Sequence, residues 1–419
     1  GLVVDGELRA LPAGSLLGIP TQAGPIGSSL GEDAALAVTA EPQLPGTPLT
    51  EDVSVGELTR RRLGDAIVDC LVDPLLGGVY AGRADQLSLQ ATMPAVAAEL
   101  THTPSLVRAA EAALEAARRG PGAAAPARGP SDDGERPTVG RLPASAVFGT
   151  VRGGMGALPD AVLRASGAEL RLRLPVREVL RSGHGFRVIA GPVPAPTLLD
   201  ADAVIIAAPA AKAAPMLSEL APMASYELAQ IAYASLAIVT LAYQAGALPP
   251  GSGMLVPATA GRRVKALTYS SQKWAHLAGE HVIVRASIGR HGDEQALHRD
   301  DAELVELAAR DAAELTSLPG GVGGRAGVIG APVAARVSRW GGALPQYAVG
   351  HTDRVRRIFD QVATVPGLAV CGAAYQGVGV PACIRSGQQA AASVLASLRE
   401  PGRRGGAGGG SGSLGESES

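Results

Sequence analysis

The sequence predicts a mixed α/β fold, and three patterns along the chain point to it. A largely apolar run at 201–209 is typical of a strand that is covered on both faces, and Pro209 ends it before a helix. Three further segments have the pattern of antiparallel strands: 231–243, 264–270 and 281–288. Near the end of the chain, a short buried strand at Leu368 leads through a glycine-rich turn into a helix, which Pro381 opens.

The elements before residue 120 are expected to be a strand hairpin followed by helices. Asp5-Gly6 lies between apolar residues, which is a good hairpin signal. Ser54 and Glu57 have the spacing of a capping box. Apolar residues recur behind it at helical spacing: Leu58, Leu63, Ile67, Leu71 and Leu75. Helix is expected to continue through 89–119, and the Gly- and Pro-rich residues 120–137 are expected to form a mobile loop.

Helices and strands are also expected after a Gly-Gly-Met-Gly turn at 153–156. Helices are expected at three segments, 158–166, 210–220 and 300–318. Strands are expected at three more, 169–179, 186–190 and 333–340. After Pro401 the chain is rich in Gly, Ser and Glu and has no apolar face, so we expect it to be disordered.

Composition excludes several classes of protein. The 419 residues are enough for two or three domains, 46% of them are apolar, and the formal net charge of −2 gives no support for nucleic-acid binding. Three cysteines without a C-x-x-C pair, and seven histidines without ligand spacing, argue against a disulfide framework and a metal site. The apolar runs are far shorter than the roughly 18 residues that a membrane span needs. We therefore expect a cytoplasmic protein that touches membranes at most at their surface.

The most informative stretch of the chain runs from Leu368 to Gly387. Gly372, Gly377 and Gly379 let the backbone come close to a flat or bulky group. A helix N-terminus behind bare backbone suits an anion, and a reduced flavin ring is one such anion. Taken alone, the pattern is more often that of an ordinary strand–turn–helix packing unit.

Two motifs together resemble the protoporphyrinogen/coproporphyrinogen oxidase family, within the flavin amine oxidase-like superfamily. The first is the string from Leu368 to Gly387. The second runs from Val72 to Leu89 and is similar to the family pattern P-x-x-x-G-V-Y-A-G-D-x-x-x-L-S. Arg83 departs from this pattern, which has an acid at that place. The resemblance extends over nearly all of residues 1–400.

The resemblance implies an FAD-dependent amine oxidase-like fold with interleaved domains. The expected substrate domain comprises 1–50 and 221–350, and a helical subdomain that faces substrate and membrane comprises 51–150. The expected FAD-binding domain comprises 151–220 and 351–400, with a tail at 401–419. No G-x-G-x-x-G precedes residue 50, so comparison with the family implies an N-terminally truncated chain that lacks the first βαβ unit.

The resemblance also implies FAD as the cofactor and assigns contacts to it. Val176 is expected against the adenine, with a plain edge strand as the alternative. Ala208 and Pro209 are expected beside the dinucleotide. Trp340 is expected near the flavin, with a core tryptophan as the alternative. The residues expected to contact the isoalloxazine ring or its turn are Gly372, Val378, Gly379 and Val380.

For the substrate, the family comparison assigns four residues to the wall of a tetrapyrrole cavity: Gly77, Gly78, Val79 and Tyr80. The alternative is a helix C-cap turn, because Gly commonly follows an apolar helix. Arg9 is the expected partner of the substrate carboxylates. The cluster from Arg60 to Arg62 is expected to be a solvated helix face, and His351 is expected to be structural.

The reaction implied is the oxidation of a porphyrinogen to a porphyrin in heme biosynthesis, in three two-electron steps, with dioxygen reduced to hydrogen peroxide. Because the cofactor carries such chemistry, no catalytic side chain is expected. The composition resembles that of high-GC bacterial proteins and favours coproporphyrinogen III, with a ferrochelatase as downstream partner. The alternatives are another enzyme of the same fold, such as an amine oxidase or carotenoid desaturase, and a non-catalytic, truncated porphyrin-binding fragment.

Overall fold

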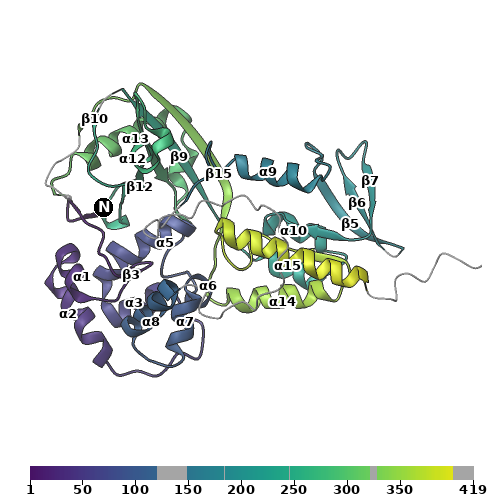
Figure 1. The fold of residues 1–419 in the computed structure, drawn as a ribbon, viewed down its shortest axis with the longest axis horizontal. Helices are drawn as coiled ribbons and strands as arrows, with labels where there is room; N and C mark the ends of the chain where they lie inside the picture. The colour runs from purple at the N-terminus through teal and green to yellow at the C-terminus, as the bar shows by residue number, and fades with distance from the viewer. Residues whose placement is uncertain (120–148, 184, 245, 321–327, 400–419) are drawn as a thin grey trace, which may run out of the picture. The chain divides into compact units, whose positions relative to one another are not determined.

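A computed structural model describes residues 1–119, 149–183, 185–244, 246–320 and 328–399. These residues form two compact units (Figure 1), of which the first comprises Gly1–Leu172 and Tyr233–Val349 and the second Arg173–Ala232 and Gly350–Ser419. The expected mobile loop at 120–137 and the expected tail at 401–419 lie outside the described residues. No helix among the described residues has both the length and the apolar character required to cross a membrane.

The first unit is built on a seven-stranded mixed sheet. Its strand order is β15 (Ala334–Pro345), β9 (Tyr233–Tyr243), β13 (Val282–Ile288), β12 (Val264–Tyr269), β11 (Gly253–Leu255), β1 (Leu2–Val4) and β2 (Glu7–Arg9). Only β1 and β11 pair in parallel. The expected hairpin is confirmed, because β1 and β2 pair around Asp5 and Gly6, whose φ angles of 50° and 76° suit such a turn. The antiparallel strands expected at 231–243, 264–270 and 281–288 are confirmed as well.

One helix shares a core with this sheet. In α13 (Asp301–Thr316), Leu304 and Ala308 are fully buried in a cluster with side chains of β9, β12 and β13. Asp300 and Glu303 form a reciprocal capping box that satisfies backbone N–H groups at the start of the helix. The helix expected at 300–318 is therefore confirmed, with its first residue set by the cap.

Helices fill most of the chain between residues 23 and 119. They are α1 (Ala23–Leu30), α2 (Glu32–Ala40), α3 (Val55–Leu63), α4 (Asp65–Ile67), a π-helical stretch (Val68–Val72), α5 (Asp73–Tyr80), α6 (Leu89–Thr92), α7 (Pro94–Leu100) and α8 (Leu106–Arg119). Ser54 caps α3 as expected, since its hydroxyl accepts from the Glu57 N–H at 3.0 Å. The short remaining elements of this unit are β3 (Ser15–Leu16), β4 (Ile19–Pro20), α9 (Ala157–Ser166), β10 (Gly246–Ala247), α12 (Ser270–Lys273) and β14 (Val328–Ile329).

The arginine cluster on α3 is not a purely solvated face, and that expectation is wrong. Arg62 is largely buried and pairs at 2.6 Å with Glu41, whose side chain is fully buried. Arg60 forms ion pairs with three aspartates: Asp65, Asp69 and Asp85. The sequence pattern could not indicate this, because every one of these carboxylates lies outside α3.

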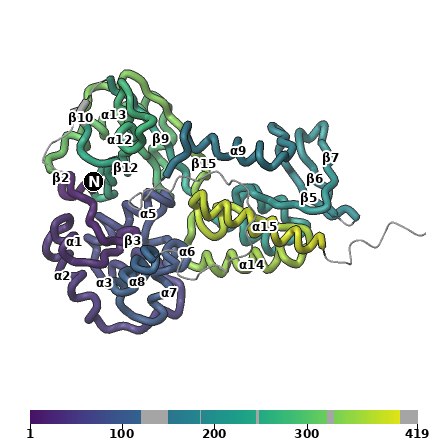
Figure 2. The backbone as a smooth tube through the Cα atoms, in the orientation of Figure 1, coloured from purple at the N-terminus to yellow at the C-terminus, as the bar shows by residue number. Residues whose placement is uncertain are grey.

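The described part of the second unit contains two small sheets and four helices. Strands β5 (Val176–Ser182), β6 (Gly185–Ala190) and β7 (Thr197–Ala201) form an antiparallel sheet, while β8 (Val204–Ile206) and β16 (Leu368–Val370) pair in parallel. The helices are α10 (Ala210–Leu217), α11 (Pro222–Ala229), α14 (His351–Ala363) and α15 (Val380–Arg399). Figure 2 shows α14 and α15 running alongside each other.

Two expectations for this unit need correction. The apolar run at 201–209 is not one strand: β7 ends at Ala201 in the antiparallel sheet, and β8 starts at Val204 in the parallel pair. Apolar character does not specify which neighbour a strand pairs with. The strand expected from 169 begins only at Val176. Residues up to Ala232 belong to this unit, in which Glu227 of α11 is bound to α14 by two ion pairs, with Arg354 and Arg357.

Candidate functional site

In the first unit, the expected substrate segment is the last turn of a helix rather than a loop. Gly77, Gly78, Val79 and Tyr80 are the final four residues of α5. Ala81 follows with a φ of 50°, in the left-handed region that usually ends a helix. Hence the two glycines lie inside the helix, and the C-cap alternative applies to Ala81 rather than to them.

The four residues face in two directions. Gly78 is exposed and Val79 is 40% exposed, whereas Gly77 is buried and Tyr80 is only 6% exposed. The Tyr80 ring packs at 5.5 Å from that of Tyr347, and burial raises the pKa of Tyr80 to about 12. Gly78 and Val79 are thus the members of the predicted set that remain accessible to a ligand, and we call them the exposed face of α5.

Charged groups hold the turn that follows α5. Asp73, at the start of the helix, accepts from the Ala84 N–H at 2.8 Å. Its second oxygen lies 3.4 Å from the guanidinium of Arg290, which also donates to the Val256 carbonyl at 2.9 Å. A side chain at Gly77 would have its Cβ 3.1 Å from the Arg290 guanidinium. Glycine at 77 therefore lets α5 pack closely against an arginine that sequence reasoning missed.

Arg9 and Trp340 occupy other parts of the first unit. Arg9 ends β2, donates to the Ser29 carbonyl at 3.1 Å and lies 3.4 Å from Glu7. Its side chain is 28% exposed, so part of the guanidinium remains accessible. Trp340 lies on β15, pairs with Leu236 and is 53% exposed, so it is not a core tryptophan.

In the second unit, a strand–turn–helix elbow joins β16 to α15 as expected. The helix begins at Val380, one residue before the expected Pro381. Gly372 and Gly377 have φ angles of 124° and 128°, which side chains rarely adopt. At Gly377 an added Cβ would lie 2.7 Å from that of Ala382. The backbone path of the elbow therefore depends on these glycines.

Side chains from α14 and α15 hold the elbow in place. Ser386, 9% exposed, accepts from the Gly372 N–H at 3.1 Å. His351 is 1% exposed and its Nε2 lies 3.0 Å from the Tyr375 carbonyl oxygen. The rings of Phe359 and Tyr375 stack at 5.4 Å. His351 thus contacts backbone in the interior, which is a structural arrangement, while the role of Ser386 was not recognised in the sequence.

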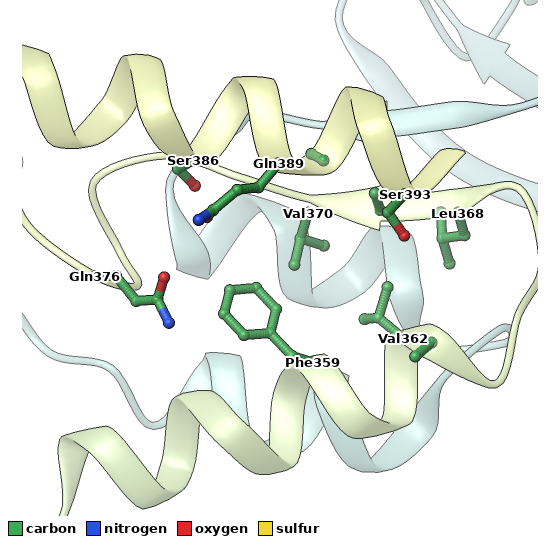
Figure 3. Close-up of a pocket in the computed structure, with 11 residues that line it drawn as sticks. Phe359, Val362, Leu368, Val370, Gln376, Ser386, Gln389 and Ser393 are labelled. Atoms are coloured by element: carbon green, nitrogen blue, oxygen red, sulfur yellow. The ribbon is translucent and has the colours of Figure 1, made fainter. Parts of the chain in front are cut away.

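A pocket of about 320 Å³ lies beside β16, between α14 and α15. Figure 3 shows Phe359 and Val362 of α14 on one side of it, Ser386 and Gln389 of α15 on the other, and Gln376 at one end. Within the described parts of the chain, β16 has a strand partner on one side only, which is β8.

Some of the predicted cofactor residues follow the two strands of this parallel pair in sequence. The Cys371 N–H donates to the Ile206 carbonyl at 3.1 Å, so the residues after β8 and those after β16 leave the sheet side by side. Ala208 and Pro209 follow β8, and Pro209 is the N-cap of α10. Ligands of open α/β sheets bind beyond the carboxyl ends of the strands, which is where these segments lie.

The remaining predicted residues are accessible to different degrees. Gly379 is exposed, Val380 is 46% exposed and Val378 is half-buried, so the start of α15 presents bare backbone flanked by two valines. Val176 is the first residue of β5, pairs with Ala190 and is 37% exposed. Over the described residues, His, Cys, Asp and Glu form no group of three that can hold a metal ion.

Comparison with known proteins points in one direction. The family model described as "Flavin containing amine oxidoreductase" matches residues 4–395. The coproporphyrinogen III oxidase of Mycobacterium tuberculosis (strain ATCC 25618 / H37Rv) is 36% identical, covering 94% of this chain and 77% of that protein. The coproporphyrinogen III oxidase of Bacillus subtilis (strain 168) is 30% identical, covering 95% and 79%. A crystal structure of a protein assigned as a protoporphyrinogen oxidase, from Exiguobacterium sp. 255-15, matches with a TM-score of 0.71 and 28% identity, covering 94% and 78%.

Proposed function

The chain belongs to the flavin containing amine oxidoreductase family, and from this premise we propose that it oxidises coproporphyrinogen III to coproporphyrin III. The names of the relatives at 36% and 30% identity support this choice of substrate. In the chain itself, the supporting observation is the exposed face of α5. A flat macrocycle can approach the backbone at Gly78, since no Cβ stands there.

We propose FAD as the particular flavin, held by the second unit. The fit rests on the exposed backbone of Gly379, on the positive φ angles of Gly372 and Gly377, and on the adjacent carboxyl ends of β8 and β16. Val378 and Val380 would pack against the ring, while Ala208 and Pro209 would lie near the dinucleotide, with Val176 near the adenine. When bound, a flavin supplies the capacity to accept two electrons from the substrate.

The chain's own contribution is to position the substrate and to stabilise charge. The start of α15 favours negative charge close to Val380, because the positive end of the helix dipole lies there. With a ring packed against them, the valine side chains on either side of Gly379 would exclude water from the same place. Arg9, with its partly exposed guanidinium, is our candidate for a substrate carboxylate. We assign no side chain as a proton acceptor.

The proposed reaction balances with dioxygen as the oxidant. Conversion of a porphyrinogen to a porphyrin removes six electrons and six protons, in three two-electron steps. Three molecules of dioxygen take them up and leave as three molecules of hydrogen peroxide. The metal-free porphyrin produced is the substrate class of a ferrochelatase, which is the enzyme we propose to act next.

The test is turnover by the purified, FAD-loaded protein. We expect a visible flavin absorption band, porphyrin fluorescence that rises faster than in the autoxidation control, and hydrogen peroxide at three equivalents per porphyrin. An amine that is oxidised while coproporphyrinogen III is not would assign the chain to another activity of the family. Protein that is colourless and takes up no FAD would favour a non-catalytic fragment instead.

A further inference from the structure

A buried lysine contacts the side of α5 that faces away from solvent. Lys265, on β12, is only 6% exposed, and its Nζ donates to the Gly77 carbonyl oxygen at 3.2 Å. Throughout the part of the chain that the structure describes, no carboxylate oxygen lies within 4.0 Å of this ammonium. The role of Lys265 is therefore not that of an ion-pair partner.

A β-bulge directs this side chain toward α5. Val264 pairs with Ile288 and Ala266 with Ser287, so Lys265 is the extra residue of β12 between them. Val264 and Leu267, on either side of it, both belong to the core cluster that includes α13. Bulges commonly re-aim one side chain in this way, and here the residue that is re-aimed reaches a helix 188 positions away in sequence.

Among the described residues, Lys265 is one of three donors from other segments that hold the end of α5. The Tyr80 carbonyl accepts from Gln346 Nε2 at 2.8 Å, and the Ala81 carbonyl accepts from the His291 N–H at 2.7 Å. The Gly77 carbonyl also accepts from the Ala81 N–H at 3.1 Å, and because carbonyls at the end of a helix carry partial negative charge, a cation is a favourable second donor there. Because the donors come from different segments of the first unit, they restrain how deeply the last turn of α5 is buried and how it is rotated about the helix axis.

The fold itself does not need a charge at this position. Burial, together with the positive charge of Arg290, lowers the pKa of Lys265 to about 7, so the ammonium is costly to keep there. Asp73, which pairs with Arg290, offsets only part of this lowering of the Lys265 pKa. A methionine has a similar length and would fill the space without that cost. A role beyond stability is therefore indicated.

We propose that Lys265 is a positioning residue, whose hydrogen bond to Gly77 fixes the exposed face of α5, Gly78 and Val79, in the orientation that receives the porphyrinogen. The identity of the substrate rests on the proposed function. The attachment of α5 to β12 does not, and it can be measured separately.

The test compares Lys265→Met with Asp311→Asn in the FAD-loaded protein. Asp311 is 7% exposed and accepts from the N–H of Val264, so its substitution perturbs the same strand one residue away without touching α5. We expect Lys265→Met to accelerate amide exchange in peptides covering 77–84 by about tenfold, the scale of one lost charged hydrogen bond. We expect it also to raise KM for coproporphyrinogen III by about tenfold at a nearly constant kcat, whereas Asp311→Asn leaves both readouts unchanged.

The two measurements test the attachment of α5 and its link to the substrate separately. Unchanged exchange at 77–84 in Lys265→Met would overturn the positioning role, whatever the activity. Faster exchange with an unchanged KM would overturn the link to substrate. Faster exchange in a wild-type enzyme that does not oxidise coproporphyrinogen III would leave the attachment of α5 supported and refute the proposed substrate.

Discussion

Lys265→Met should change how the stability of the first unit depends on pH. In the folded protein, burial lowers the pKa of Lys265 to about 7, while an unfolded lysine has a pKa of about 10.4. Between these values the unfolded chain binds more protons than the folded one, so the free energy of unfolding rises with pH. For this pair of values the rise is about 1 kcal/mol from pH 7 to pH 8 and about 2 kcal/mol from pH 7 to pH 9. The variant lacks this contribution.

The assay is urea unfolding of both proteins at pH 7, 8 and 9. Tryptophan fluorescence is a suitable probe, because Trp274 and Trp340 both lie in the first unit. The wild type should gain stability relative to Lys265→Met at each step in pH, and the variant should be at least as stable as the wild type at pH 7. A difference in stability that stays constant across the three pH values would refute the reasoning, since Lys265 would then keep the same protonation in both states.

Three further substitutions follow from particular contacts. Gly377→Ala should lower FAD content and destabilise the elbow by about 1–3 kcal/mol, because it combines a φ of 128° with a Cβ contact of 2.7 Å. Gly372→Ala has a similar φ but open space around the added Cβ, so it should destabilise the elbow less. Equal losses of stability in thermal unfolding of the two variants would contradict this. Gly78→Val should raise KM for coproporphyrinogen III without lowering Tm, since position 78 is exposed and the nearest atom to an added Cβ is 4.0 Å away. An unchanged KM would argue against the exposed face of α5 as part of the substrate site. Glu41→Ala should lower the free energy of unfolding by about 3–5 kcal/mol at any pH near neutral, as measured by urea unfolding. The reason is that it removes the ion-pair partner of Arg62 and the acceptor of the first N–H groups of α8. A decrease below about 1 kcal/mol would show that water replaces the carboxylate.

Local patterns account for most of the elements that could be predicted. The hairpin at Asp5, the cap at Ser54 and the strand–turn–helix elbow all depend on residues within a few positions of one another. A turn residue or a capping side chain acts on its own backbone neighbours, so its effect can be read without knowing the rest of the fold. The family resemblance then supplied the fold class and the cofactor type, which the comparisons support.

Contacts between distant residues explain where prediction failed. The run at 201–209 divides between two sheets, since β7 and β8 find different partners. The arginines of α3 are paired because aspartates and Glu41 from other segments approach them. Apolar or charged character sets whether a residue can be buried or paired, but the choice of partner depends on the free energy of bringing remote segments together.

The sequence by itself determined the hairpin at Asp5, the cap at Ser54, the glycine-rich elbow before α15 and the family that the motifs resemble. Only the tertiary structure decided that Gly78 and Val79 face outward while Gly77 and Tyr80 face inward, and that a bulge in β12 carries Lys265 to the end of α5. The reason is physical: a helix has the same local geometry whichever side is covered, and the sheet that covers it selects the side that stays exposed.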